Sequence, residues 1–325
     1  MIVLTQDHVK SLLPMAEAIE VIAHAMIGVS KRDVELPLRN ILPVGGGNMM
    51  GVMPGAIGDP ACFGVKLVSL FHDNPARGLS SHRGAIVLFE SETGGAVAMM
   101  DASLLTAIRT AAASAVATRV LARTDATSLA IIGYGEQAEH HLDAMMAVRD
   151  ITKLHVAGRN PDKSAAFAAR AALAYPQLQA THGTDIQAAV KTADIVCTVT
   201  SSPTPILKGD WIAPGTHVNI VGSSVASMRE VDDAMVLRSA IWVDYLPSTL
   251  AQAGEIVEMI AAGTYAASDL MGEIGALLDG QIGGRGSDGE ITTYRSLGVA
   301  AQDLAAAHHV TKAAGKQGIG QVVEF

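Results

Sequence analysis

The chain has 325 residues, a formal net charge of −9, 49% hydrophobic residues and 17% charged residues. Its length predicts about two domains, and its low charged fraction excludes an intrinsically disordered chain. The excess of acidic residues disfavours nucleic-acid binding through a basic face. Aromatic residues make up only 4%, so the core must be built from aliphatic side chains and the 14 methionines.

Cysteine usage and the N-terminal segment suggest a compartment. Cys62 and Cys197 do not form a disulfide framework and fit a reducing environment. The first ten residues lack the pattern of a signal peptide, and the longest uncharged stretch, 40–58, is broken by Gly and Pro. We therefore expect a cytoplasmic protein without a membrane partner.

The first 121 residues predict a mixed α and β region. Residues 5–30 predict one helix, because Met15, Ile19, Ile22 and Met26 recur with helical spacing. Residues 36–100 alternate short apolar runs with Gly, Pro, Asn and Asp, which predicts strands and turns, with a hairpin turn at 90–95. Residues 101–121 are rich in Ala and predict a helix.

The second half of the chain has a different pattern of hydrophobic segments. Five short segments rich in Val and Ile alternate with helical stretches, namely 128–133, 153–159, 193–200, 217–224 and 240–245. Nearly continuous apolar strands that alternate with helices are typical of βαβ units and of a parallel sheet covered on both faces. The predicted fold class is therefore α/β, with a further helix at 296–315.

The first of these segments ends in a glycine-rich turn with the pattern G-x-G-x-x-A. Gly133 allows a tight turn, Gly135 lets the backbone approach a pyrophosphate, and Ala138 permits close packing of the following helix. The helix N-terminus then offers free N–H groups to the phosphates. The alternative is a tight turn without a ligand. The cofactor-binding residues expected here are Gly133, Tyr134, Gly135, Glu136, Gln137 and Ala138.

The end of the next predicted strand bears on which dinucleotide binds. Sites for NAD usually place an acidic residue there, but this sequence has Arg159 and Lys163 instead. A guanidinium can bind a 2′-phosphate and stack on adenine, so NADP(H) is favoured and NAD(H) remains possible. The alternative is that Arg159 is only a solvated loop charge.

Several segments together resemble the ornithine cyclodeaminase/μ-crystallin family. They are GVMPG at 51–55, GVKLVSLF at 64–71, GLSSHRGAIVLFE at 78–90, AIRTAAASAVAT at 107–118, LAIIGYGEQA at 129–138, VGSSVASMREVD at 221–232 and YRSLGVAAQDLAAA at 294–307. The resemblance implies a nicotinamide enzyme that acts at the Cα–N bond of an amino or imino acid, and a homodimer. It also implies a Rossmann domain, 120–300, inserted into an α+β domain for substrate binding and dimerisation, 1–119 plus 301–325.

Two cations are the main candidates for catalysis and substrate binding. Arg109 is one of few charges on its Ala-rich helix, and the family pattern matches it to a ligand of the substrate carboxylate, for which a guanidinium is suited. Lys66 lies inside an apolar run, so it either snorkels at an edge or has a buried anionic partner. It could hold the carboxylate or donate a proton to the imine nitrogen.

The resemblance adds weaker candidates. Arg39 resembles a further substrate-site arginine, although an exposed loop charge is the competing interpretation. Ser81 is expected near the substrate, and His82 is a candidate proton donor or a structural histidine at a strand start. Thr110 and Thr200 are expected to contact the cofactor, although Thr110 could instead bond to its own helix backbone.

One position separates the reactions of the family. Cyclodeaminases carry an Asp in the loop after the fifth Rossmann strand, where this sequence has Ser224, a poor base without a partner. We therefore rank an NAD(P)H-dependent reductase of a small α-imino acid (a ketimine, pyrroline-2-carboxylate or iminosuccinate type) above an ornithine cyclodeaminase and a non-catalytic binding protein. Glu230, Asp232 or Asp233 could still replace the missing carboxylate. No metal site is expected, and His140 and His141 are interpreted as a solvated helix face.

Overall fold

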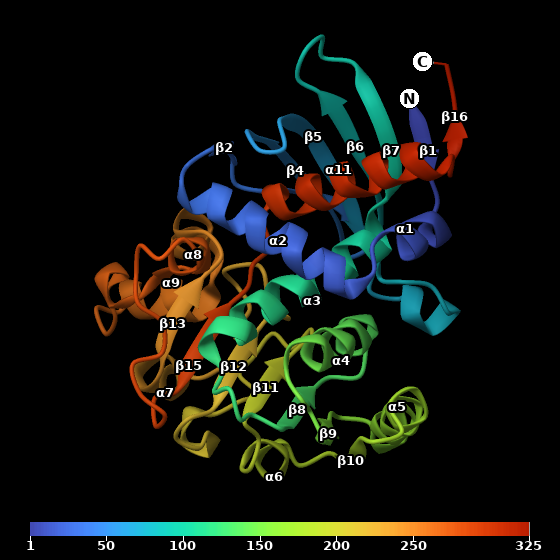
Figure 1. The fold of residues 1–325 in the computed structure, drawn as a ribbon. Helices are drawn as coiled ribbons and strands as arrows, with labels where there is room; N and C mark the ends of the chain where they lie inside the picture. The colour runs from blue at the N-terminus through green and yellow to red at the C-terminus, as the bar shows by residue number, and fades with distance from the viewer. Residues whose placement is uncertain (325) are drawn as a thin grey trace. The chain divides into compact units, whose positions relative to one another are not determined.

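The computed structural model describes residues 1–324 and divides the chain into two compact units. Unit 1 is Met1–Ala112 together with Val299–Phe325, and unit 2 is Ala113–Gly298. The long Ala-rich helix α3 (Ala102–Leu121) begins in unit 1 and ends in unit 2 (Figure 1). The division therefore falls inside this helix, a few residues before the domain boundary expected from the sequence.

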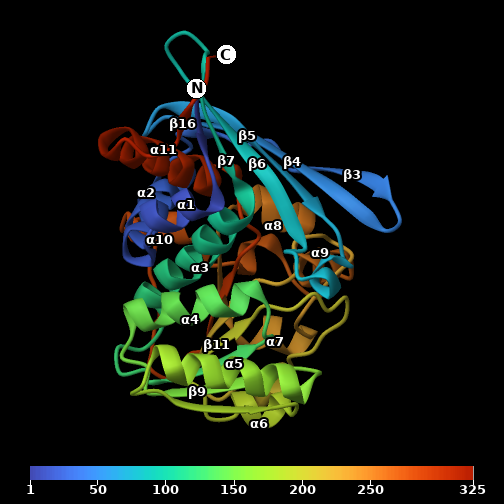
Figure 2. The same ribbon diagram turned by 90° about the vertical axis from the view of Figure 1, so that its right-hand side faces the viewer.

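Unit 1 is built on a sheet with the strand order β16-β1-β7-β6-β5-β4-β2, to which β3 adds by pairing with β4. The β3–β4 hairpin extends away from the rest of the sheet (Figure 2). All strand pairs of the unit 1 sheet are antiparallel except the pair of β1 with β7. The strands are β1 (Ile2–Leu4), β2 (Val34–Glu35), β3 (Asn40–Gly45), β4 (Asn48–Ile57), β5 (Cys62–Leu70), β6 (His82–Glu90), β7 (Ala96–Asp101) and β16 (Gln321–Val322).

Helix α11 (Ala300–Gln317) returns from the C-terminal end of the chain to pack on β4, β5 and β6. It lies beside α2 (Met15–Ser30), as Figure 1 shows. The predicted helix at 5–30 is in fact two, α1 (Gln6–Leu12) and α2, which meet at an angle of 84°. Pro14 explains the break, because it lacks an N–H and disfavours a helical conformation at Leu13.

Unit 2 is a doubly wound parallel sheet with the order β10-β9-β8-β11-β12-β15-β13-β14. The five predicted segments correspond to β8 (Ser128–Ile132), β9 (Lys153–Ala157), β11 (Ile195–Thr198), β12 (His217–Ile220) and β13 (Ala240–Val243). Three strands were not predicted: β10 (Gln179–Gly183), β14 (Gly272–Glu273) and β15 (Thr292–Arg295). The predicted α/β class with a Rossmann-type sheet is confirmed.

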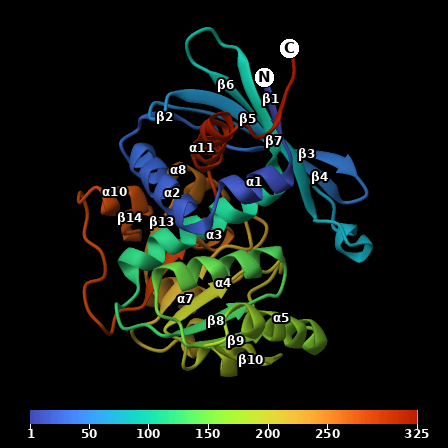
Figure 3. The same cartoon turned by 45° about the vertical axis from the view of Figure 1, so that its right-hand side comes forward.

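Helices connect these strands, and Figure 3 shows α4 and α5 beside β8, β9 and β10. They are α4 (Glu136–Val148), α5 (Pro161–Ala174), α6 (Ile186–Val190), α7 (Asp233–Arg238), α8 (Leu246–Gln252), α9 (Gly254–Ala261) and α10 (Ile274–Leu278). The chain order reverses between β8 and β11, which are neighbours in the sheet. Ligands of such sheets bind outside the carboxyl ends of the strands at this switch point.

Helix α3 is long and apolar enough to cross a membrane, and α1 with α2 would pass the same test only as one bent pair. Most of α3 is buried within the structure, as in the core helices of globular proteins. The uncharged stretch at 40–58 forms β3 and β4.

Candidate functional site

Three charged side chains meet in the interior of unit 1, each from a different element. Lys66 lies on β5, Arg109 on α3 and Asp303 on α11. Lys66 Nζ lies 2.8 Å from Asp303 Oδ2, and Arg109 Nε donates to Asp303 Oδ1 at 2.9 Å. All three side chains are almost completely buried. Burial of charges at this depth requires such pairing, so the buried anionic partner considered for Lys66 is Asp303.

The strand register explains why Lys66 is inside. Cys62, Gly64 and Lys66 alternate along β5 on the buried face of the sheet, the face against which α11 packs. A Cβ on Gly64 would lie 2.4 Å from the backbone oxygen of Val87 on β6 and 2.9 Å from Leu304 Cδ2 on α11, so the glycine permits close packing of both elements against this strand.

Arg109 is held at two of its three nitrogens. Besides the bond from Nε to Asp303, its Nη1 donates to Gln302 Oε1 at 2.8 Å. Within residues 1–324, no protein group accepts a hydrogen bond from Nη2. The guanidinium is therefore fixed in orientation and keeps one nitrogen for an external acceptor such as a carboxylate.

The charges in this group shift one another's pKa values. Burial, helped by the charge of Arg109 and by that of Arg39, lowers the pKa of Lys66 to about 7, and Asp303 opposes this shift. Burial alone would raise the pKa of Asp303, but the charges of Arg109 and Lys66 together hold it below its usual value. Asp303 is consequently an anion at neutral pH, whereas Lys66 changes charge close to neutrality.

Two of the weaker candidates lie within electrostatic range of the same group. Desolvation, followed by the positive charge of Lys66, lowers the pKa of His82, with smaller contributions from His72 and Arg109. Ser81 Oγ lies 3.0 Å from His82 Nδ1 at the start of β6. Arg39 acts on Lys66 as a nearby charge. Unit 1 thus brings together the predicted substrate-site residues Lys66, Arg109, His82 and Arg39, with Ser81 beside His82.

Unit 2 contains the glycine-rich turn between β8 and α4. Gly133 has φ +122°, and a Cβ there would lie 2.8 Å from the carbonyl oxygen of Val199, so only glycine fits without strain. Gly135 is the N-cap of α4, and a Cβ on it would meet nothing within 4 Å. Ala138 is fully buried against the sheet. Open space in front of a helix N-terminus fits the phosphates of a dinucleotide.

The other predicted cofactor residues lie around this turn. Glu136 and Gln137 form the first turn of α4, and Tyr134 Oη accepts a hydrogen bond from the Asn160 backbone N–H at 3.3 Å. Arg159 and Lys163 are exposed after β9, where no acidic residue ends the strand. Thr110 is buried in the part of α3 that belongs to unit 1.

Glu230 is a buried carboxylate that the sequence analysis left without a defined task. It accepts hydrogen bonds from Thr198 Oγ1 at 2.9 Å, from the Thr200 backbone at 2.8 Å, from Thr200 Oγ1 at 2.7 Å and from the Gly222 backbone at 2.6 Å. It therefore joins the loops that follow β11 and β12. Burial raises its pKa, and the hydrogen bonds from Thr200 and Thr198 oppose that shift.

The other two acids of this loop also have structural partners. Asp232 caps α7 through the Met235 N–H at 3.0 Å and accepts from the Gly209 N–H at 2.9 Å. Asp233 pairs with Arg229. Ser224 is half-buried in the loop after β12, and none of the three acids is left without a partner of its own.

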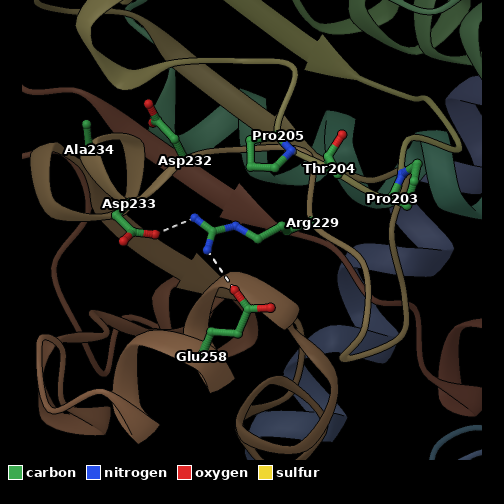
Figure 4. A pocket seen from close by; sticks show the side chains of 8 residues that line it. All are labelled: Pro203, Thr204, Pro205, Arg229, Asp232, Asp233, Ala234 and Glu258. Atoms are coloured by element: carbon green, nitrogen blue, oxygen red, sulfur yellow. Dashed lines mark hydrogen bonds and ion pairs between the residues drawn. The ribbon is translucent and has the colours of Figure 1, made fainter.

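A surface pocket of about 540 Å³ lies in unit 2 between the loop after β11 and the start of α7 (Figure 4). Arg229 reaches across it to Asp233 and to Glu258, at 2.8 Å from the latter. None of the predicted site residues lines this pocket.

The structure corrects the interpretation of His141 and adds Gln302 and Asp303 to the buried charged group. His141 is not on a solvated face: it is fully buried, with Ser114 Oγ 3.0 Å from its Nε2 and the Gln137 carbonyl 2.7 Å from its Nδ1, and burial lowers its pKa to about 4. Sequence reasoning also gave no role to Asp303 or Gln302. Their signal was visible, because they are polar residues within the Ala-rich stretch 299–307, as Arg109 is within its own helix. Among residues 1–324, no cluster of three or more His, Cys, Asp or Glu side chains could hold a metal ion.

The chain resembles known proteins in sequence and in fold. The family model described as "Ornithine cyclodeaminase/mu-crystallin family" matches residues 1–318. The chain belongs to this family. A Delta(1)-pyrroline-2-carboxylate reductase from Bacillus cereus is 33% identical over the whole of both chains.

Two solved structures are also similar. The Thermococcus litoralis Delta(1)-pyrroline-2-carboxylate reductase in complex with NADH and L-proline has a TM-score of 0.95 and 32% identity, and the match covers 99% of this chain and 100% of that one. An archaeal alanine dehydrogenase dimer with bound NAD has a TM-score of 0.93 and 29% identity, over 100% and 99% of the two chains. The predicted family is thus confirmed, and the predicted reaction type agrees with the names of the reductases.

Proposed function

We propose that this protein is an NAD(P)H-dependent reductase of a small α-imino acid. The observation that carries the proposal is the buried Lys66–Asp303–Arg109 group, in which two cations share one anion and Arg109 Nη2 remains available. Such a group has a surplus of positive charge and suits a ligand that carries a carboxylate. In these roles unit 1 would bind the substrate and unit 2 the dinucleotide.

The chemistry follows from the residues. When bound, a nicotinamide dinucleotide would supply the hydride that reduces the imine carbon. Arg109 would hold the carboxylate on that carbon and so fix its position. Lys66 Nζ would donate the proton that the imine nitrogen needs as the C=N electron pair moves onto it, and a pKa of about 7 suits that task at neutral pH. His82 is the alternative donor, with Ser81 orienting its ring, and Arg39 would add positive charge.

The loop after β12 favours reduction over cyclodeamination. Cyclodeamination needs an acid–base group that shuttles protons, and Ser224 is a poor one. Glu230 binds two loops, Asp232 caps a helix and Asp233 is paired with Arg229, so each of the alternative acids already has a structural task. Reduction needs no such carboxylate.

The cofactor preference is a separate proposal. The similar structures contain NADH or NAD, which supports a nicotinamide dinucleotide as cofactor. In this chain the strand β9 is followed by Arg159 and Lys163, both exposed, and the strand does not end in the acidic residue that is usual for NAD sites. These cations favour NADP(H), with the turn 133–138 and Thr110 and Thr200 completing the contacts.

We also propose a homodimer formed through the second face of the unit 1 sheet. The register places Phe63, Val65, Val87, Phe89 and Met99 on the face opposite Lys66, where they are half-buried or exposed. Phe63 and Phe89 stack there with ring centroids 5.2 Å apart. A second copy is the occupant we favour, because a contiguous apolar sheet face needs a cover and a similar alanine dehydrogenase is a dimer.

Sedimentation analysis tests the dimer. The variant Phe63→Glu/Met99→Glu should sediment as a monomer, whereas Leu173→Glu, at a more exposed apolar side chain of unit 2, should leave the mass unchanged. A wild-type monomer, or a dimer that survives the double change, would exclude this face as the interface.

A substrate panel tests the reaction. We expect oxidation of NADPH with Δ1-pyrroline-2-carboxylate, Δ1-piperideine-2-carboxylate or iminosuccinate, one cofactor for each amino acid formed. Ornithine with NAD should release no ammonia. Ammonia release without net change of the cofactor would instead identify a cyclodeaminase, and dinucleotide binding without turnover on either kind of substrate would identify a binding protein.

A further inference from the structure

We infer that Asp303 is a positioning residue for this reaction: its carboxylate keeps Lys66 protonated and locks Arg109 with Nη2 directed to the substrate carboxylate. The inference rests on the proposed function and deepens it. None of the sequence motifs assigned a role to Asp303, and it reaches the group from the far end of the chain on α11.

The two carboxylate oxygens of Asp303 contact different cations. Oδ1 accepts from Arg109 Nε at 2.9 Å, and Oδ2 lies 2.8 Å from Lys66 Nζ. One rigid carboxylate thus sets the distance between the group that would bind the substrate and the group that would donate a proton to it. A side chain shift at Asp303 would move both at once.

The contacts of Arg109 restrict how its guanidinium can bind a carboxylate. A guanidinium with all three nitrogens open can rotate and bind a carboxylate through either edge. Here Nε is bound by Asp303 and Nη1 by Gln302, the residue next to it on α11. These two bonds leave both N–H groups of Nη2 and the second N–H of Nη1 as donors, so the edge between Nη1 and Nη2 is the one that remains for the substrate carboxylate.

Cations outnumber anions among the charged groups that act on Lys66. The groups that act on its ammonium are Arg109 from α3, Arg39 from the segment before β3, and Asp303 from α11, while His82 of β6 lies within range of Lys66. Asp303 is the one anion among them. Without it, burial and the nearby cations would all act to remove the proton from Lys66.

The test is the variant Asp303→Asn, which keeps the shape and removes the charge. In imine reduction, the wild-type kcat should fall as the pH rises through the Lys66 pKa, because only the protonated amine donates. In Asp303→Asn this fall should move to lower pH by about 1–3 units, the usual effect of one close opposite charge. If the variant folds and its kcat falls at the same pH as that of the wild type, the inference is overturned.

Two control variants separate positioning from general structure. Gln302→Leu removes the neutral partner of Arg109, so it should raise KM but leave the pH of the fall unchanged. Glu255→Gln removes the carboxylate of the buried Glu255–Arg295 pair in unit 2. The Glu255→Gln variant should have a lower unfolding temperature, but its kcat should fall at the same pH as that of the wild type. An equal pH shift in Glu255→Gln would show that loss of any buried ion pair has this effect, and would also overturn the inference.

A charge-balanced pair of variants covers the case in which Asp303→Asn does not fold. Lys66→Met should abolish the fall with pH, and Lys66→Met/Asp303→Asn removes one cation and one anion together. Relative to the wild type, whose group carries the same net charge, the double variant should bind pyrrole-2-carboxylate, a flat unreactive carboxylate, at least about tenfold more weakly, the factor for a lost charge-assisted hydrogen bond. Equal affinities would overturn the role of Asp303 in locking Arg109.

The binding readout also separates this inference from the proposed reaction. If the wild-type protein reduced no imino acid, the proposed function would fail. Calorimetric binding of pyrrole-2-carboxylate across pH would still report on Asp303. Wild-type binding that weakens as Lys66 loses its proton, with the same change at lower pH in Asp303→Asn, would support the positioning role, and pH-independent binding in both would refute it.

Discussion

Asp303 in unit 1 and Glu230 in unit 2 are both fully buried carboxylates, but their partners differ. Asp303 faces two cations, and Glu230 faces hydroxyl groups and backbone N–H groups. The pKa of Asp303 is lowered and that of Glu230 is raised, although burial pushes both upward. In this protein, the buried acid beside two cations is part of the group proposed to bind the substrate carboxylate, whereas the buried acid beside neutral donors joins two loops.

The largest expected effect is at the cationic group. Arg109→Ala should lower kcat/KM for the imino acid by about 10²-fold or more, because the substrate carboxylate loses its anchor and the reacting carbon its position. The affinity for NADPH, measured by fluorescence titration, should change little. Arg229→Ala, at a paired arginine of the unit 2 pocket, is the matched control. An unchanged kcat/KM would remove Arg109 from the site.

A comparable change at Glu230 should act on stability first. In Glu230→Gln the amide nitrogen cannot accept the hydrogen bonds that one carboxylate oxygen now accepts, which leaves buried donors unpaired at a cost of about 1–3 kcal/mol. Urea unfolding should show this loss, and dinucleotide affinity should weaken because the loop with Thr200 is released. Glu258→Gln, an exposed acid, should change neither. A loss of imino-acid binding alone would contradict the assignment.

Ser224→Asp addresses the reaction itself. A carboxylate at this position should lower the kcat of imine reduction by about tenfold, which corresponds to a loss of about 1.4 kcal/mol of transition-state stabilisation. It should also produce ammonia release from ornithine with NAD. Ser227→Asp, an exposed position of the same loop, is the control. Intact reduction without ammonia release would show that Ser224 does not select the reaction.

The smallest expected effect is at the exposed end of β9. Arg159→Ala should raise KM for NADPH by about fivefold, the upper range for an exposed ionic contact, and should leave KM for NADH unchanged. Arg170→Ala removes an arginine of the neighbouring helix that pairs with Glu139, and should affect neither cofactor. A wild-type preference for NADH, or equal effects on both cofactors, would refute the NADP(H) proposal.

The sequence predicted those buried strands that consist mostly of apolar residues. The strands β8, β9, β11, β12 and β13 are Val- and Ile-rich and were identified. The strand β15 was missed, because its Thr292 and Arg295 look like surface residues, although both are buried and hydrogen-bonded. The edge strand β10 was missed because it is mostly exposed and carries no apolar run.

The site was predictable to a similar extent. Lys66 and Arg109 stood out as charges in apolar surroundings, and a buried anion was considered for Lys66. That anion is more than 190 residues from Arg109 in sequence, so local pattern could not locate it. His141 was misjudged because a histidine pair on a helix looks polar. Only the packing of α4 shows that one of the pair faces Ser114.

The return of α11 to the N-terminal sheet has a consequence for biosynthesis. Unit 2 is one continuous segment, whereas unit 1 is complete only when its last helix has been made. A ribosome-bound chain can therefore fold its parallel sheet while Lys66 and Arg109 still lack the acid that neutralises them. Synthesis of α11 supplies that acid and completes the packing of the unit 1 sheet.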